Sequence, residues 1–375
     1  MNRSRIVRLA LAASLLWSTA SVAAADKVLL VVSSHGRVST EKPAGFDMAE
    51  YAQAYWLFRD HGYEVQVASP SGGEAIPDRY EAEAPPTARL LAAPEAMTQL
   101  RNTRQPEQLN PADYAAVLVI GGKGAMFDLP GADPLHKLLA RHYQGGGVLG
   151  TVCHGAAALL GVKQADGRPL IAGRAVNSFS REEERLFNPD WSKRYPFVLE
   201  DRLREQGARF EAAPPMLIHV TRDERLFSGQ NPFSTAPLVE AMLRALGREP
   251  KPRQIGSDEL TLRLLGRLLV PAQRPEAERE LAAEPNRFQP RLIALYGTRL
   301  AKGANGSAEL ETALHLMTLA APYFSHPRLD LARAETLRKL GRSEAARQLL
   351  EQASGRHPSA PELKQALAEL ETASR

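Results

Sequence analysis

The chain has 375 residues, of which 44% are hydrophobic and 24% are charged, a balance typical of a globular protein with a sizeable core. Its formal net charge is +4, but three of these charges belong to Arg3, Arg5 and Arg8, close to the start. The remaining positive excess of about one charge is too small to indicate a partner by itself, and we predict no nucleic-acid binding.

The first 25 residues have the pattern of a secretory signal. The three arginines precede the apolar run LALAASLLW, and small residues at Ala23 to Ala25 precede Asp26. We therefore expect residues 1–25 to be cleaved and the protein to be periplasmic or secreted. An uncleaved anchor helix is the alternative, although the apolar run is short for a bilayer span of about 20 residues. No later segment is apolar enough to be an integral membrane span.

From residue 26 to 247, β-rich runs alternate with amphipathic runs. The expected strands are 27–34, 64–69, 115–122 and 146–152, and the expected helices are 47–62, 134–144, 197–208 and 235–247. Alternation of this kind predicts a mostly parallel sheet between helices, which is a flavodoxin-like α/β fold. The stretch 216–232 is also strand-like. A long segment at 71–113 is expected to be a lid-like insertion beside the functional site.

A different composition follows a polar, proline-bearing linker at 248–257. Residues 258–375 are rich in Leu, Ala, Glu and Arg at helical spacing and show no strand signal. PRLDLARAE begins at Pro327 and PELKQALAE begins at Pro361, a period of 34 residues, and PRLIALYGT at Pro290 resembles an earlier copy. This period predicts an all-α tetratricopeptide-like domain that binds or packs, with a generic helical bundle as the alternative.

The most informative stretch runs from Gly147 to Gly161 and holds the only cysteine, Cys153, followed by His154. The apolar run before Cys153 predicts a strand, and the small residues after it predict a helix. A thiol at such a strand-to-helix turn has the geometry of a nucleophile elbow, and the neighbouring imidazole could move protons. A buried, inert cysteine beside a capping histidine is the alternative.

Two further features strengthen the chemical interpretation. Gly121 and Gly122 end the preceding strand, at the sheet edge where ligands bind, and their amides could approach an oxyanion. Glu50 lies on the first predicted helix, where its carboxyl group could reach the thiol. Taken singly, the glycines fit a tight turn and Glu50 fits a solvated helix surface.

These segments together resemble a known family. VLVIGGKGAMFDLP, GGVLGTVCHGAAALL, NSFSREEE and RLFSGQNPFST are similar to segments of the ThiJ/PfpI superfamily, and in particular to its heat-shock chaperone and glutathione-independent glyoxalase (glyoxalase III) branch. The resemblance covers about residues 27–247. It does not cover the helical C-terminal region, and an export signal is unusual in this mostly cytosolic family.

The resemblance implies roles for individual residues. Cys153 matches the family nucleophile, His154 its adjacent histidine, and Glu50 the glutamate that contacts the thiol. The family's third catalytic residue is acidic, and among Glu182, Glu183 and Glu184 we favour Glu183. We predict no cofactor and no metal, because the family's zinc-binding insertion has no counterpart in 70–114, which contains no histidine.

The implied activity is glyoxalase chemistry without glutathione, in which a 2-oxoaldehyde such as methylglyoxal becomes a 2-hydroxy acid (a lyase of the lactate dehydratase class). Three alternatives remain: a cysteine peptidase, an amidotransferase-like hydrolase, and a stress chaperone or scaffold. An amidotransferase would need a His-x-Glu sequence after Cys153, and none is present. We further expect a protein or peptide partner for the helical region, and the resemblance allows a homodimer.

Overall fold

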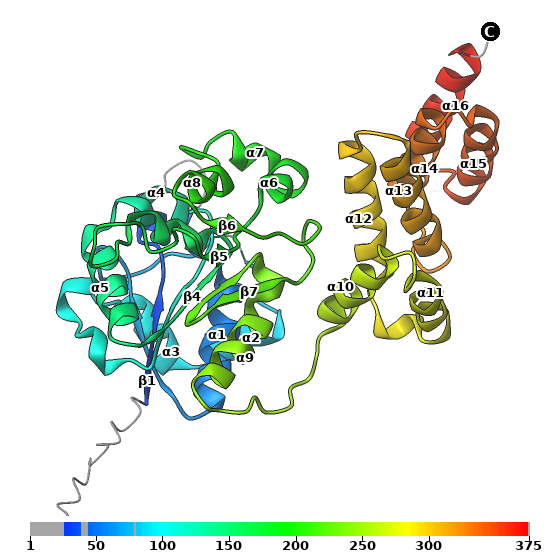
Figure 1. The fold of residues 1–375 in the computed structure, drawn as a ribbon. Helices are drawn as coiled ribbons and strands as arrows, with labels where there is room; N and C mark the ends of the chain where they lie inside the picture. The colour runs from blue at the N-terminus through cyan, green and yellow to red at the C-terminus, as the bar shows by residue number, and fades with distance from the viewer. Residues whose placement is uncertain (1–25, 39–43, 79, 374–375) are drawn as a thin grey trace, which may run out of the picture.

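The computed structural model describes residues 26–38, 44–78 and 80–373. The expected signal peptide lies outside these ranges. Within them, no helix combines the length and the apolar character that a membrane span requires. Figure 1 shows an α/β domain followed by an array of helices.

The α/β domain is built on a six-stranded sheet with strand order β2-β1-β3-β4-β8-β7. Its strands are β1 (Lys27–Val31), β2 (Glu64–Ala68), β3 (Ala116–Val119), β4 (Val148–Val152), β7 (Val220–Asp223) and β8 (Leu226–Gly229). All neighbouring pairs are parallel except β7 and β8, which form an antiparallel hairpin. The predicted flavodoxin-like α/β fold is therefore confirmed. The strand-like stretch 216–232 contains this hairpin, and β5 (Ala175–Val176) pairs with β6 (Arg209–Phe210) in a small second sheet.

Helices cover both faces of the large sheet (Figure 1). In β1, Val28 and Leu30 belong to the core on one face, while Leu29 and Val31 belong to the core on the other, and all four are fully buried. Burial on both faces explains why the strands are continuous apolar runs rather than alternating ones.

The first face packs against the helices α1 (Met48–Asp60), α2 (Pro85–Leu91), α3 (Pro94–Arg101) and α9 (Thr235–Ala245). The second face packs against α5 (Asp133–Gln144), α8 (Leu199–Glu205) and the 3-10 helix η5 (Cys153–Gly161). Three short helices, α4 (Ala125–Asp128), α6 (Arg181–Phe187) and α7 (Pro189–Ser192), complete the domain.

The segment 71–113, for which we predict a lid, is divided between two places. Its helices α2 and α3 pack into the core beside α1 and β2, through Leu90 and Leu100 among others. Its first part lies nearer the carboxyl ends of the strands, where Asp78 accepts a hydrogen bond from the amide of Gly45 (2.8 Å). The lid function itself stays a prediction.

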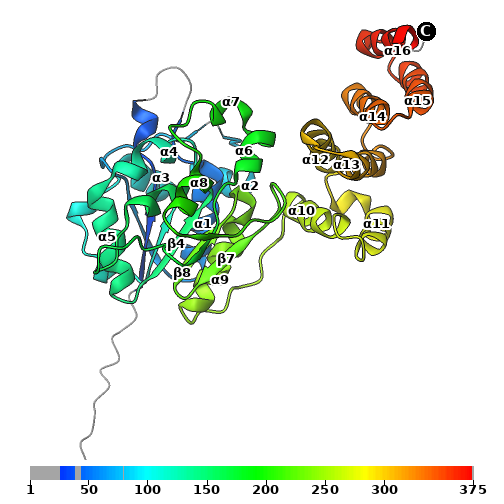
Figure 2. The ribbon, with the colours of Figure 1, turned by 45° about the horizontal axis from the view of Figure 1, so that its top comes forward.

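The C-terminal region is helical throughout its described part. It contains α10 (Ser257–Leu268), α11 (Arg274–Ala283), α12 (Pro290–Gly303), α13 (Ser307–Ala320), α14 (Pro327–Lys339), α15 (Ser343–Arg356) and α16 (Pro361–Ala373). The three prolines of the predicted repeat each begin a helix, where a missing backbone N–H costs nothing. Successive helices pair as antiparallel hairpins that stack into an elongated array (Figures 1 and 2).

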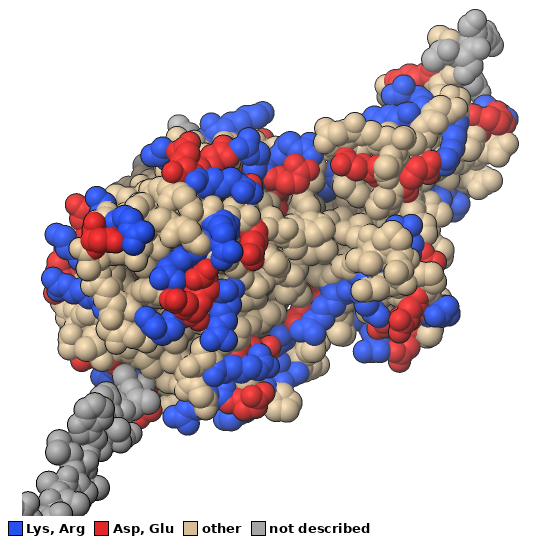
Figure 3. Space-filling model, in the orientation of Figure 1, with Lys and Arg blue, Asp and Glu red and all other residues tan. Residues whose placement is uncertain are grey.

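The helical region contacts the α/β domain through α12. Arg185 of α6 donates a hydrogen bond to the carbonyl oxygen of Gly303 (3.1 Å), and the rings of Phe187 and Tyr296 lie 6.2 Å apart. Leu217 of the α/β domain is buried in the core of the helical array. The face of the molecule in Figure 3 has few charged side chains at this junction, while acidic and basic residues are mixed over the rest of it.

Candidate active site

Cys153 stands at the turn from β4 into η5, as the elbow interpretation predicts. Its φ angle is +55°, in the left-handed region that non-glycine residues rarely adopt. Such a conformation costs on the order of 1–3 kcal/mol and is held in place by the surrounding packing. The strained turn directs the thiol toward the carboxyl end of the sheet, beside the glycine turn that follows β3.

The glycine turn has to be free of side chains at Gly121. A β-carbon there would lie 2.8 Å from Cys153 Cβ and 2.8 Å from Glu50 Oε2, closer than packed atoms can approach. Gly122 has a φ of +102° and packs against the backbone at Phe46 and Asp47. These contacts bring α1, the turn after β3 and the elbow after β4 into one site.

His154 connects the thiol to an acidic residue. Its Nδ1 lies 3.4 Å from Cys153 Sγ, and its Nε2 lies 2.6 Å from Glu184 Oε1. When Nε2 carries the proton that the carboxylate accepts, Nδ1 presents its lone pair to the thiol. The imidazole is also packed against the rings of Phe179 and Tyr195, with centroid distances of 4.9 and 5.3 Å. The arrangement is a Cys-His-Glu chain.

The structure corrects our choice of Glu183 as the partner of His154. Glu183 instead forms a capping box at the start of α6: its carboxylate accepts a bond from the Ser180 amide (2.7 Å), and Ser180 Oγ accepts one from the Glu183 amide (3.2 Å). Its other oxygen accepts bonds from the Met216 amide (2.7 Å) and from the side chains of Gln230 (3.0 Å) and Asn231 (2.9 Å). Both carboxylate oxygens of Glu183 are therefore used in hydrogen bonds that stabilise the start of α6 and the segments beside it.

Glu50 lies against the thiol, as expected. It is fully buried on α1, whose N-cap is Asp47. Burial, reinforced by the charge of Asp47, raises the pKa of Glu50 well above its usual value, and an interaction with the Cys153 side chain opposes this. A carboxyl group with a raised pKa retains its proton near neutral pH and can donate it in a hydrogen bond.

The two oxygens of Glu50 differ. Oε2 accepts a hydrogen bond from the Gly121 amide (2.7 Å). The prediction that this amide faces an oxyanion is therefore wrong for the resting site, because Glu50 already occupies it. Oε1 is buried and has no hydrogen-bond partner within the described part of the chain.

Two other backbone amides belong to the turns that form the site. The amide of His154 donates to the Cys153 thiol and favours its thiolate. The Gly122 amide donates no hydrogen bond to any of the residues that the structure describes. These two amides, rather than that of Gly121, are the candidate oxyanion donors.

The thiol is almost enclosed. Cys153 and His154 are each only 4% exposed. Burial is the main cause that raises the pKa of Cys153, followed by the nearby carboxyl groups of Glu50 and Asp47. A protonated Glu50 carries no charge, so protonation of this carboxyl removes the largest electrostatic effect that opposes ionisation of the Cys153 thiol.

Two site residues have no counterpart in our sequence predictions. Asn188 donates hydrogen bonds to Glu184 Oε2 (2.9 Å) and to the hydroxyl of Tyr195 (3.2 Å), so it fixes the carboxylate that holds His154. Tyr195 is mostly buried, which raises the pKa of its hydroxyl. No motif marks either residue in the sequence. Among residues 26–38, 44–78 and 80–373, no three His, Cys, Asp or Glu side chains are grouped as metal ligands would be.

Comparisons with known proteins identify relatives of both parts of the chain. Residues 41–180 match the DJ-1/PfpI family, and residues 327–370 match the tetratricopeptide repeat. The glutathione-independent glyoxalase hsp3101 of Schizosaccharomyces pombe is 31% identical over 236 residues, which is 60% of this chain and 97% of the relative. Glyoxalase 3 of Candida albicans is 29% identical over 231 residues, 58% of this chain and 98% of the relative.

Solved structures give the same result. Rapid Encystment Protein 24 KDa of Francisella tularensis has a TM-score of 0.55 and 29% identity, covering 59% of this chain and 98% of that protein. Glyoxalase III from Candida albicans has a TM-score of 0.53 and 26% identity, covering 58% and 96%. On this evidence the chain belongs to the DJ-1/PfpI family and carries a tetratricopeptide repeat in its C-terminal helical region.

Proposed function

We propose that this protein is a glutathione-independent glyoxalase that converts a small 2-oxoaldehyde, such as methylglyoxal, into a 2-hydroxy acid. The observation that carries the proposal is the contact chain from Cys153 Sγ through His154 to Glu184, together with the buried carboxyl group of Glu50, which interacts with the same thiol. Relatives of similar sequence are named for the same activity.

The reaction begins with the thiol. Cys153 Sγ forms a bond to the aldehyde carbon C1, and the thiol proton passes through His154 Nδ1 to the aldehyde oxygen to give a hemithioacetal. Glu50 supplies a hydrogen bond from its protonated carboxyl group. The amides of His154 and Gly122 stabilise negative charge on the oxygen; removing one such donor typically costs about 2.7–4 kcal/mol of transition-state stabilisation.

His154 then moves a proton. Its Nδ1 removes the hydrogen from C1, the electron pair forms the C1–C2 double bond, and the C2 oxygen is protonated to an enediol. Protonation at C2, with loss of the proton from the C1 hydroxyl group, gives a thioester in which C1 has been oxidised and C2 reduced. Water breaks the C1–S bond, releasing the 2-hydroxy acid and the free thiol. Glu184 stabilises the imidazolium that forms when His154 holds the proton.

The burial of the site favours a small substrate. A sulfur on a residue that is only 4% exposed is accessible to a molecule of a few heavy atoms more readily than to a polypeptide backbone. This favours the glyoxalase activity over the cysteine peptidase.

The experiment is turnover of methylglyoxal by the full chain and by Cys153→Ser, with lactate measured as product. We expect lactate formation by the wild type and none by the variant. Equal turnover by the two proteins would refute the proposal. Loss of a protective effect on aggregating proteins only when the helical region is altered, with no lactate formed by the wild type, would instead favour the chaperone or scaffold.

We also propose that residues 1–25 direct export of the protein, on the basis of their sequence pattern. N-terminal sequencing of protein recovered from the periplasm or medium tests this. A chain that retains its first 25 residues in the cytoplasmic fraction would contradict it.

A further inference from the structure

Acidic side chains from two helices surround the thiol of Cys153. Asp47 is the N-cap of α1 and Glu50 lies in its first turn, while Glu183 and Glu184 lie in the first turn of α6. Glu50 and Glu183 are fully buried, and Glu184 is almost so. Burial is the main cause of the raised pKa of the thiol, and the charges of Glu50, Asp47 and Glu183 add to it. A further negative charge beside the sulfur is therefore repelled from both helices.

Asp47 is held beside the glycine turn by its own hydrogen bonds. Its backbone amide donates to the carbonyl oxygen of Gly121 (3.0 Å). Its Oδ1 accepts hydrogen bonds from the amides of Ala49 (2.9 Å) and Glu50 (3.0 Å). The position of this carboxylate is thus fixed by the start of α1, and its charge cannot move away from the site without breaking the helix cap.

Two cations lie in the same region, but they are directed elsewhere. Trp191 lies against Tyr195, the ring that packs on the imidazole of the site, with 6.0 Å between the centroids. Lys123 Nζ and the guanidinium carbon of Arg194 lie 5.7 and 5.5 Å from the centroid of Trp191. Lys123 Nζ is also paired with Asp78 (3.2 Å), which compensates its charge. These cations contact Trp191 rather than the thiol.

We propose that the site accepts uncharged 2-oxoaldehydes and discriminates against those that carry a carboxylate or phosphate group, and that the same repulsion weakens binding of the carboxylate product. This inference rests on the glyoxalase activity proposed above. In that reaction proton transfers accompany the bond changes at C1 and C2, so a neutral substrate brings no net charge among the carboxylates. The 2-hydroxy acid is an anion at neutral pH, because carboxyl groups ionise near pH 4.

The first test compares two 2-oxoaldehydes that differ in charge. These are 4,5-dioxopentanoate and its methyl ester, with methylglyoxal as the reference and the full mature chain as the enzyme. The ester is the larger compound, so steric exclusion would favour the acid, whereas repulsion favours the ester. We expect kcat/KM to be at least about tenfold lower for the acid than for the ester.

The second test uses compounds closer in size to methylglyoxal. Lactate and lactamide are compared as inhibitors of methylglyoxal turnover near neutral pH, where only lactate is charged. We expect the inhibition constant of lactate to be at least about tenfold higher than that of lactamide. This measurement decides the question if neither five-carbon compound enters the site.

Two variants link the discrimination to named charges. Asp47→Asn keeps the oxygen that caps α1 and removes the charge, so it should reduce both ratios at least about threefold. Lys123→Gln leaves the charge of Asp78 uncompensated and should increase them. Each ratio compares two compounds on one protein, so a change in thiol reactivity that affects both compounds cancels.

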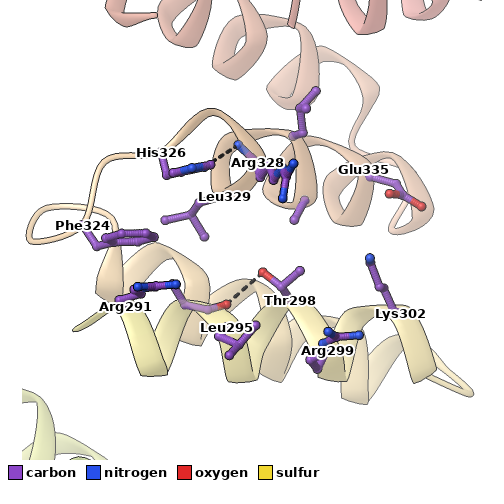
Figure 4. A pocket seen from close by; sticks show the side chains of 13 residues that line it. Arg291, Leu295, Thr298, Arg299, Lys302, Phe324, His326, Arg328, Leu329 and Glu335 are labelled. Carbon is purple, nitrogen blue, oxygen red and sulfur yellow. Dashed lines mark hydrogen bonds between the residues drawn. The ribbon is translucent and has the colours of Figure 1, made fainter. Parts of the chain in front are cut away.

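The matched control for Asp47→Asn is Glu335→Gln on α14. Glu335 lines a groove of about 710 Å³ between α12 and α14 in the helical array, away from Cys153 (Figure 4). The control makes the same change in net charge, and both ratios should stay at their wild-type values. Circular dichroism checks that all the variants are folded.

The outcomes separate this inference from the proposed function. No turnover of methylglyoxal by the wild type refutes the glyoxalase activity itself. When methylglyoxal is turned over, three results overturn the charge discrimination: turnover of the acid as fast as that of the ester, inhibition by lactamide that is absent or no stronger than by lactate, and equal ratios in Asp47→Asn and Glu335→Gln. Ratios well above one that fall only in Asp47→Asn support it.

Discussion

Two adjacent glutamates on α6 should respond differently when each is changed to glutamine: one change should mainly affect activity, and the other should mainly affect stability. Glu184 contacts His154 and Asn188, whereas Glu183 contacts Ser180 and three further donors. We expect Glu184→Gln to lower activity more than stability, and Glu183→Gln to lower stability first.

The expected fall in activity of Glu184→Gln follows from the contact between Glu184 and the imidazole of His154. Glutamine keeps the size of the side chain but removes the negative charge 2.6 Å from His154 Nε2, so it no longer stabilises the imidazolium. Proton transfer by a positioned histidine is worth about 10²–10⁴-fold in rate, and we expect kcat to fall about 100-fold with KM nearly unchanged.

The expected loss of stability of Glu183→Gln follows from the N–H groups that donate hydrogen bonds to this carboxylate. The Ser180 amide is bonded to one carboxylate oxygen, and the Met216 amide with two side-chain amides is bonded to the other. Glutamine has one acceptor oxygen, so its NH2 group has to face a donor. A buried donor without a partner costs about 1–3 kcal/mol of the free energy of unfolding.

The assays are lactate formation from methylglyoxal and urea denaturation followed by circular dichroism, each on both variants and the wild type. If Glu183→Gln loses kcat while keeping wild-type stability, or Glu184→Gln keeps kcat, the assignment of the two residues is wrong.

Two further variants extend these tests. Glu50→Gln should be more stable than wild type above about pH 4. The difference should grow by at most about 1.4 kcal/mol per pH unit until the raised pKa of Glu50 in the folded state is reached, and stay constant above it, because only between the two pKa values does the unfolded chain alone release the proton. A pH-independent difference in urea denaturation would contradict the raised pKa. Gly121→Ala should lower kcat about 100-fold, because a β-carbon there would lie 2.8 Å from Cys153 Cβ and 2.8 Å from the backbone oxygen of Val152, and a misplacement on the order of 1 Å can cost up to about 100-fold. Gly306→Ala, which has open space around it, is the matched control, and equal activity of the two variants would refute this role of the glycine turn.

The sequence was sufficient to predict the sheet and the elbow. Strands buried on both faces are recognisable as apolar runs, and the change at Cys153 from β-rich to small residues marks the turn. The repeat was also recognisable in the sequence, because similar segments begin at Pro327 and Pro361, and each of these prolines begins a helix. The helix expected after Cys153 is the 3-10 helix η5, which spacing of small residues alone does not distinguish from an α-helix.

A local sequence pattern argues against our choice of Glu183 as the partner of His154. Ser180 and Glu183 fit the S-x-x-E pattern of a capping box, which uses the glutamate to bind the N-cap amide. That pattern assigns Glu183 to the helix start and leaves Glu184, one residue further around α6, to face the imidazole. The bond from the Gly121 amide to Glu50 had no such signal, because it joins residues 71 positions apart. Contacts of this kind depend on the tertiary fold.

The junction between the two domains decides how the helical region can be tested. Leu217 is buried among the helices of the array, and Arg185 and Phe187, on the helix that carries Glu184, contact Gly303 and Tyr296. Deleting residues 258–375 would expose these apolar groups and release one side of α6. A truncated chain that loses activity would therefore not separate a scaffold from an enzyme. A point variant separates them: Cys153→Ser should abolish lactate formation and leave any binding by the helical array unchanged.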